Sequence, residues 1–389
     1  MKRLLTFFLI CFSFVEDTRA EDIIDYKYWD EGKLTWDDFQ DTLSLKGVPS
    51  AFNAFLRIEK TEKRDGNTRT IRPEAQACFD KRHSFADRQI QNENLLRLFQ
   101  LKYDLLEMYR RRLQTELNLG VVGIAADNRT RQYMDLYTEQ SKKAEQETEN
   151  GQNEIKLQEW EFYVTKELIE NPAPSIPRIS PRRFGYGFYL GTGASFPVGS
   201  IADYWDPAWQ INVGFDLAYA NTHLLCDFSA GTARTRQEII VSNGQITDKW
   251  LRNGHNTYTS ISLGIGQQLI STKYFALMPY VGCIWSGYSD QAKIQEGRNE
   301  RTTLSYTNFN WTAGICFDYR FSTTISLVPS FWRGHREIFT ASIRTKLFIN
   351  REQFHNFKIA PDDNGSMLRG CKLGFSVACL GFSRLLQIK

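Results

Sequence analysis

From residue 184 onward, the chain repeats a pattern in which apolar residues alternate with small or polar ones. In residues 209–219 every odd-numbered position is apolar: Trp209, Ile211, Val213, Phe215, Leu217 and Tyr219. Successive side chains of a β-strand point to opposite faces, so such a segment has one apolar and one polar face. Strands of soluble sandwiches run about five or six residues, whereas these runs reach the roughly 9–11 residues with which a tilted strand crosses a bilayer. The pattern predicts an antiparallel transmembrane β-barrel with its apolar face toward outer-membrane lipid.

The strand count of this barrel, expected within residues 183–389, follows from its turns. Nine candidate strands can be drawn: residues 184–197, 208–220, 223–235, 256–271, 274–289, 305–321, 323–333, 337–349 and 369–383. Short turns at residues 221–222, 271–273 and 322–323 alternate with longer polar loops at 199–207, 241–256 and 292–303. Bacterial barrels have an even number of strands, with short periplasmic turns and longer outer loops. We expect eight strands, with residues 332–336 as a bulged interruption of one of them; ten is the alternative.

The beginning of the chain has the layout of a secretory signal peptide. A basic Lys2-Arg3 pair precedes an almost wholly apolar run over residues 4–15, and small Ala20 marks the expected cleavage point. Lys plus Arg number 48 against 45 for Asp plus Glu. This near balance gives the chain no strong positive electrostatic field that would attract nucleic acid. The sequence therefore predicts a signal peptide over residues 1–20 and a Gram-negative outer-membrane location.

A proline-rich stretch separates the barrel from a different kind of sequence. Four prolines within residues 171–182 disfavour a helix and predict a stiff linker. Residues 21–170 are polar and charged, with apolar residues at helical spacing over 93–117 and a second helical pattern ending at 168. We expect an α+β domain in the periplasm.

Three motifs in this N-terminal region resemble a known family. Residues 33–40 read Lys-Leu-Thr-Trp-Asp-Asp-Phe-Gln, residues 95–109 form the amphipathic helix, and residues 147–160 run from Glu-Thr-Glu-Asn-Gly to a tryptophan. Their order over residues 29–168 is similar to that of a family of uncharacterised, exported zincin-like domains. In that family the leading motif is LTWDDF, the helix carries an HEQxH motif, and the late segment reads ETxHG. The resemblance implies a zincin-like fold.

The residues that would bind zinc in that family are replaced here. An HExxH helix supplies two histidines for zinc and a glutamate that activates water. The matching positions hold Leu98, Phe99 and Lys102, and the histidine of the late motif corresponds to Asn150. Leucine and phenylalanine have no ligand atom, and a lysine ammonium repels a metal ion. We predict no metal, no cofactor and no catalytic residue, and hence a pseudoenzyme.

Two carboxylates survive on the same helix. Asp104 and Glu107 are possible binding residues, and Lys102 is expected to pair with one of them at the rim of the filled cleft. Such a surface suits a periplasmic protein or cell-wall partner. The alternatives are a membrane-anchored, metal-dependent hydrolase with a divergent site, and a small-solute pore.

Charged residues also occur at inward positions of the predicted strands. Four of them occupy the alternate positions that hold the polar side chains of their segments: Asp216, Asp227, Asp318 and Arg320. They are expected to form either a buried ionic network or a conduction path. The network is favoured because eight strands leave an interior just wide enough for side chains to fill.

Overall fold

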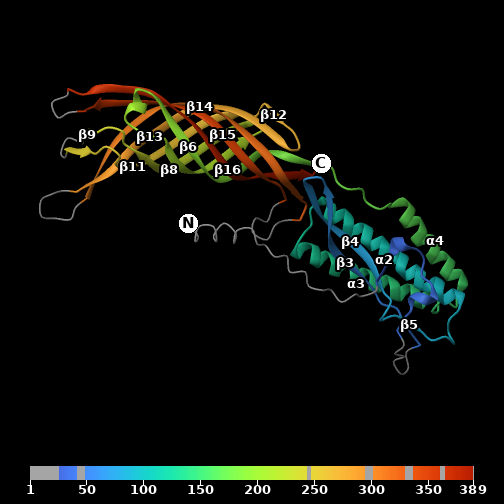
Figure 1. Cartoon of the computed structure of the whole chain (residues 1–389). Coiled ribbons are helices and arrows are strands. Elements are labelled where there is room, and N and C mark those ends of the chain that lie inside the picture. The colour runs from blue at the N-terminus through green and yellow to red at the C-terminus, as the bar shows by residue number, and fades with distance from the viewer. Residues whose placement is uncertain are drawn as a thin grey trace. The chain divides into compact units, whose positions relative to one another are not determined.

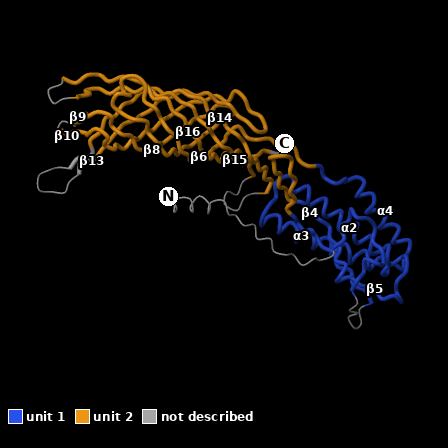
Figure 2. Tube along the Cα trace, viewed as in Figure 1, with its two compact units in different colours: residues 1–59, 74–175 blue, residues 60–73, 176–389 orange. Residues whose placement is uncertain are grey.

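A computed structural model describes residues 26–41, 49–242, 247–293, 301–328, 336–359 and 364–388, apart from the side chains of 291–293, 301–303 and 388. The predicted signal peptide lies outside these residues. The chain divides into two compact units (Figure 2). Unit 1 comprises Met1–Glu59 and Glu74–Ser175, and unit 2 comprises Lys60–Pro73 and Ile176–Lys389.

Unit 1 is built around the long helix α2, Glu93–Leu119, which packs against α3, Ile124–Glu147, and α4, Glu154–Glu170 (Figure 1). The Asn92 side chain starts α2 by accepting a hydrogen bond of 2.9 Å from the Leu95 amide. Gly120, at φ 123°, ends it. Helix α2 extends the predicted 93–117 segment by two residues. Among the described residues, no helix combines the length and apolar character that crossing a membrane requires.

Five strands precede α2 among the described residues, and two of them, β3 and β4, are divided between the two units. The bounds are β1 Tyr26–Tyr28, β2 Ser50–Ala51, β3 Ala54–Asp65, β4 Thr68–Asp80 and β5 Phe85–Ala86, with short 3-10 turns η1 at Trp29–Glu31 and η2 at Trp36–Asp38. Strand β1 pairs antiparallel with β4, and β2 with β5. Alternate β4 residues Ala75, Ala77 and Phe79 are buried in one core with the apolar face of α2. This core makes the first unit an α+β domain.

Unit 2 is a closed antiparallel barrel. Within the described residues its eight strands are β6 Ile179–Gly199, β7 Ala208–Tyr219, β8 Thr222–Arg234, β11 His255–Gln267, β13 Phe275–Lys293, β14 Arg301–Ser326, β15 Glu337–Phe357 and β16 Ser366–Ile388. Each strand pairs with its neighbour in this order, and β16 pairs with β6 to close the ring. The predicted count of eight is confirmed. The unit also includes residues 68–71 of β4, which pair in parallel with residues 323–326 of β14.

One predicted turn is wrong, although the strand count is right. Residues 322–323 do not turn, because β14 continues through them to Ser326. The irregularity there is a shift of pairing register between Arg320 and Ser322, as at a β-bulge. The segments predicted as 305–321 and 323–333 therefore merge, up to Ser326, into one strand. The expectation that residues 332–336 interrupt a single strand is also wrong, because the described segments on either side, in β14 and β15, are separate strands that pair antiparallel from Thr323–Thr340 to Ser326–Glu337.

The loops differ between the two ends of the barrel. One end has the tight β7–β8 turn and the β11–β13 connection, with β12 at Ile270–Ser271, and β6 enters the barrel there. The other end carries η3, Ser200–Asp203, and the β9–β10 hairpin, Ile239–Ser242 and Thr247–Trp250. We call these the short-turn end and the long-loop end. Strand β6 begins at Ile179, inside the stretch predicted as a linker.

In β7 the apolar positions point outward and the polar positions point inward. Phe215 is 54% exposed on the outside, whereas Gln210, Asn212 and Asp216 are buried in the lumen. Gly214 also faces inward, and a Cβ there would lie 2.2 Å from the ring of Tyr189. A glycine is therefore required at this position to make room for that tyrosine.

Candidate functional site

Three of the four positions that match the zinc-site motifs of the resembling family lie on α2, and the first two of them are buried. Leu98 and Phe99 are 1% and 4% exposed. The Phe99 ring stacks on Phe52 with centroids 5.5 Å apart and contacts Phe39 at 5.1 Å. The Trp36 ring lies edge-on to the Phe99 ring, with centroids 6.3 Å apart. Aromatic rings therefore occupy the surroundings of Phe99, and the leading sequence motif, residues 33–40, supplies two of them.

Lys102 does not pair as expected. Its Nζ donates to Glu145 of α3 at 2.5 Å, not to Asp104 or Glu107, and lies 4.6 Å from the centre of the Phe52 ring. The expectation failed because α3, which presents Glu145, was not foreseen as a neighbour of α2. The ammonium thus lies between a carboxylate and an aromatic face, a favourable cation–π arrangement.

Asn150 lies in the turn between α3 and α4. It has a positive φ of 58° and is exposed. Its backbone N–H donates a hydrogen bond to the backbone carbonyl of Glu145 at 2.9 Å. The next residue, Gly151, approaches the start of α2 so closely that a Cβ there would be 3.0 Å from the Asn94 carbonyl oxygen. Glu145 therefore connects the Asn150 turn to Lys102, and the replaced positions gather at one end of the α2–α3 pair.

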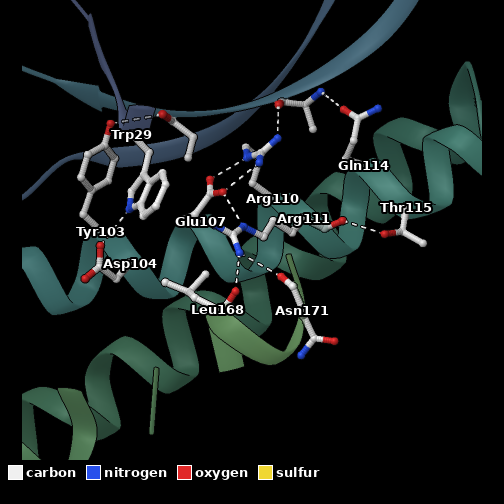
Figure 3. Close-up of polar contacts among 12 residues, drawn as sticks. Trp29, Tyr103, Asp104, Glu107, Arg110, Arg111, Gln114, Thr115, Leu168 and Asn171 are labelled. Carbon is white, nitrogen blue, oxygen red and sulfur yellow. Dashed lines mark hydrogen bonds and ion pairs between the residues drawn. The ribbon is translucent and has the colours of Figure 1, made fainter. Parts of the chain in front are cut away.

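Asp104 is held by partners within unit 1. It accepts a hydrogen bond from Trp29 Nε1 at 2.8 Å (Figure 3) and another from Gln100 Nε2 at 2.7 Å. Gln100 in turn accepts the Leu34 amide of the leading motif at 2.8 Å. Burial raises the pKa of Asp104, and the two hydrogen bonds oppose that shift. This carboxylate orders the N-terminal segment on α2.

Glu107 is the centre of a second cluster. It is 1% exposed and accepts bidentate hydrogen bonds from Arg110 at 2.6 and 2.8 Å and one from Arg111 at 2.8 Å (Figure 3). Arg111 also donates to the Leu168 and Asn171 carbonyls at the end of α4. A carboxylate with two guanidinium partners has few acceptor sites left, so the cluster ties α4 to α2.

Other groups in unit 1 offer little for catalysis. Within the described parts of the chain, no three His, Cys, Asp or Glu side chains are grouped so that they could hold a metal ion. Burial and the charge of Glu59 raise the pKa of the Cys78 thiol to about 12. A thiol that stays protonated at neutral pH is a poor nucleophile.

The barrel lumen contains two ionic groups. Arg344 donates to Asp318 at 2.7 and 2.9 Å and to Asp216 at 2.7 Å. Asp216 also contacts His223 Nδ1 at 2.7 Å. Two of the predicted inward carboxylates are therefore brought together by an arginine that the sequence reasoning missed.

The third predicted carboxylate, Asp227, belongs to a separate pair. Lys346 Nζ lies 2.7 and 2.8 Å from its two oxygens, and the Tyr189 hydroxyl donates to it. Lys346 also lies 4.9 Å from the centre of the Tyr280 ring. Arg344 and Lys346 occupy inward positions of β15, so the same alternation that predicted the aspartates would have placed both cations in the lumen.

The lumen is blocked toward the long-loop end. Trp205 is fully buried and stacks on Tyr288 with centroids 4.3 Å apart, and Phe354 contacts both rings. Next to this stack, Lys372 lies 3.2 Å from Glu352 and 3.6 Å from the centre of the Tyr258 ring. Aromatic and ionic side chains thus fill this part of the interior.

Among the described residues, no hydrogen bond or ion pair joins Arg320 to either ionic group, and its side chain bonds a backbone carbonyl instead. It is half-buried at the short-turn end, where its Nη1 donates to the Thr272 carbonyl at 2.7 Å. It borders a cavity of about 300 Å³ that also reaches Asp318 and Arg344. The four predicted lumen residues are therefore distributed over three places.

Comparisons with known proteins give low similarity. No family model matches the chain. No curated protein matches it either. Among solved structures, the chain is similar to Ail, the attachment invasion locus protein of Yersinia pestis, which was solved in complex with the heparin analogue sucrose octasulfate. The sequence identity is 12% and the TM-score is 0.27. The match covers 52% of this chain and 99% of that chain.

Two further barrels are similar over a comparable share of the chain. A major outer membrane protein from Thermus thermophilus has 11% identity, with 51% of this chain and 98% of that chain covered and a TM-score of 0.23. The N-terminal β-barrel domain of Pseudomonas aeruginosa OprF has 11% identity, 54% and 100% coverage and a TM-score of 0.19. These scores are low, and the barrel architecture rests on the strand pairing.

Proposed function

We propose that the chain is an outer-membrane protein whose barrel anchors a non-catalytic binding domain in the periplasm. The observation that carries the proposal is that the barrel is apolar on its outside and charged on its inside, the reverse of a water-soluble protein. Every strand exposes a large apolar residue on its outside: Phe188, Phe215, Phe228, Leu263, Trp285, Phe317, Leu347 and Phe375. The inside holds ion pairs. Contiguous apolar surface beyond a few hundred Å² marks an interaction or membrane face, and a ring of it around a closed barrel fits lipid.

The filled lumen supports an anchor more than a pore. The Trp205–Tyr288 stack and the Arg344 and Lys346 ion pairs occupy the interior that a solute would have to cross. An eight-stranded barrel has an interior about wide enough for side chains alone. Planar-bilayer recordings of the purified chain should show no steady conductance, and a reproducible unitary conductance would contradict the anchor.

The barrel proposal is tested by folding the full chain into lipid vesicles. A closed barrel should run faster on a gel before heating than after it, and the vesicle-inserted strands should resist trypsin. Complete digestion in vesicles, or a monomer that stays soluble without detergent, would exclude the membrane location.

The strand topology supports a periplasmic orientation of the N-terminal domain. The chain enters β6 at the short-turn end, and barrels of this class have their short turns in the periplasm. A protease site inserted between residues 173 and 176 should be cut only after the outer membrane is permeabilised. Cleavage in intact cells would place this segment outside.

The surroundings of Phe99 on α2 agree with a zincin-like domain that has lost its zinc site. Phe99 lies among Phe39, Phe52 and Trp36, so aromatic contacts replace an open coordination position. The full chain, purified after exposure to zinc and extensive dialysis, should contain far less than one zinc per chain. Stoichiometric zinc, or hydrolysis that a chelator abolishes, would overturn this part of the proposal.

The binding role is assigned to the Asn150 turn. Lys102 is a poor position for crosslinking because its amine is buried against Glu145, whereas Asn150 is exposed. A photo-crosslinking residue at Asn150 should capture a periplasmic protein or cell-wall fragment, and the same residue at exposed Glu139 of α3 is the matched control. Equal capture from both positions would reject this surface. Failure of the barrel to assemble after deletion of residues 21–171 would instead indicate a folding role.

A further inference from the structure

The short-turn end of the lumen contains a cavity that neither the anchor nor the N-terminal domain explains. Its volume is about 300 Å³. It is bordered by the β7–β8 turn at Asn221 and by Gln268 and Ser271 of the β11–β13 connection. The ion pairs of Arg344 lie at its inner side.

The described residues that line this cavity carry an excess of positive charge. Its charged lining consists of Arg320, Arg344, Arg384 and Asp318, with His223 as a further titratable group. Asp216 lies behind Arg344 and His223 and bonds both. Three guanidinium groups thus face two carboxylates even when the imidazole is neutral.

Two of the lining side chains keep polar atoms without partners. Arg344 is 1% exposed, and its Nη1 has no hydrogen-bond partner among the described residues although its Nε and Nη2 are bound to carboxylates. His223 is 6% exposed, and its Nε2 is likewise unpartnered. A buried polar group without a partner is destabilising, and more so when it is charged. Both atoms belong to residues that line the same cavity.

The two outer arginines retain donors as well. Arg320 uses Nη1 for the Thr272 carbonyl, and Arg384 uses Nη2 for the Ala220 carbonyl at 2.6 Å and Nη1 for the Arg183 carbonyl at 3.5 Å. These backbone contacts fix each guanidinium at the rim of the cavity. A guanidinium has five donors in a planar fork that matches the oxygens of phosphate.

We propose that this cavity binds a phosphate-type oxyanion, with Arg344 and His223 at its base and Arg320 and Arg384 at its rim. The oxygens of such a group satisfy the free Nη1 of Arg344, and a protonated His223 donates from Nε2. The volume admits free phosphate or the phosphate of a lipid headgroup with its acyl chains outside. This site needs no membrane to exist, so the inference stands independently of the proposed location.

The test uses the full chain in zwitterionic detergent and two probes. Inorganic phosphate is titrated by calorimetry in one arm, and micelles doped with short-chain phosphatidylglycerol are titrated in the other. The variants R320Q and R384Q remove rim charges that are already half-buried, and R351Q removes an exposed arginine outside the cavity as the control. Gel mobility before and after heating checks that each barrel is closed.

We expect wild type and R351Q to bind at least one probe with the same affinity. Each rim variant should weaken that binding about tenfold or more, since hydrogen bonds to charged groups contribute roughly 1.5–3 kcal/mol. Binding of inorganic phosphate identifies a free oxyanion, and binding of the doped micelles alone identifies a lipid headgroup. Absence of binding in both arms, or binding that R320Q and R384Q leave unchanged while their barrels are closed, overturns the proposal.

Discussion

Replacing Phe215 by arginine probes the outer face of the barrel at its most informative position. Phe215 is 54% exposed and lies near the middle of β7, where it pairs with Cys226 of the neighbouring strand β8. On a water-facing surface an arginine here would be tolerated. In a bilayer it would lie near the midplane, where arginine on the lipid face of a barrel costs about 2–4 kcal/mol.

The matched comparison uses the same face of the same strand. Tyr219 is 62% exposed at the end of β7, where the cost of arginine falls to about 0–1 kcal/mol. Phe215 also packs edge-on against Phe188 with centroids 5.5 Å apart, a contact that contributes roughly 0.5–1.5 kcal/mol. Phe215→Leu removes that contact and adds no charge. The difference between F215R and F215L therefore isolates the charge in lipid.

The assay is reversible unfolding by denaturant in lipid vesicles, followed by tryptophan fluorescence. We expect F215R to lose about 2–4 kcal/mol beyond F215L, and Y219R to lose at most about 1 kcal/mol. Arginine at Gly214 is unsuitable as a control, because any side chain there meets the Tyr189 ring. Equal losses for F215R and Y219R would refute the assignment of this face to lipid.

Three further substitutions test the interior contacts. Glu107→Gln should cost about 3 kcal/mol in urea unfolding followed by helical circular dichroism, because it leaves Arg110 and Arg111 partly uncompensated; a loss below about 1 kcal/mol would contradict the role of this cluster. Asp38→Asn should cost about 1–2 kcal/mol at pH 7, since Asp38 accepts from Lys27 at 2.7 Å. Burial alone would raise the pKa of Asp38, but hydrogen bonds from Lys27 and Thr35 lower it overall. Its contribution is therefore present above the unfolded pKa of about 4 and lost as pH falls through the lower folded value, so the gap to wild type should narrow progressively as the pH is lowered below about 4; a pH-independent gap would refute that explanation. Lys346→Met should destabilise the barrel by about 3–5 kcal/mol by leaving Asp227 unpaired, and the double variant D227L/K346M should recover most of the loss; no recovery would show that the loss does not come from the unpaired carboxylate.

The barrel was predictable because its signal is local. Alternation in β7 places Gln210 and Asp216 inside and Phe215 outside whatever the rest of the chain does. The end of β14 was not predictable in the same way. Ser322 and Thr323 are polar residues that suit a turn, yet β14 continues through them because β15 pairs with it there. Pairing between strands therefore decided what the local pattern left open.

The candidate sites needed contacts that a single sequence does not reveal. The helical spacing of α2 identified the faces of Leu98 and Phe99, but the charge-rich α3 has a weak apolar pattern and its Glu145 was not foreseen as the partner of Lys102. In the lumen, parity placed Asp216 and Asp318 inside, yet only the folded barrel brings Arg344 between them. Periodicity gives faces, whereas partners depend on the packing of distant segments.

Nitroxide labels on the outward positions of β7 test the central claim most directly. One label at a time is placed on Trp209, Ile211, Val213, Phe215, Leu217 or Tyr219 of the full chain in outer-membrane vesicles, and its collisions with oxygen and with a water-soluble nickel complex are measured. A strand that crosses a bilayer predicts that the ratio of oxygen to nickel accessibility peaks at Val213 and Phe215 and falls toward both ends. Labels that meet the nickel complex equally at all six positions would contradict a transmembrane barrel.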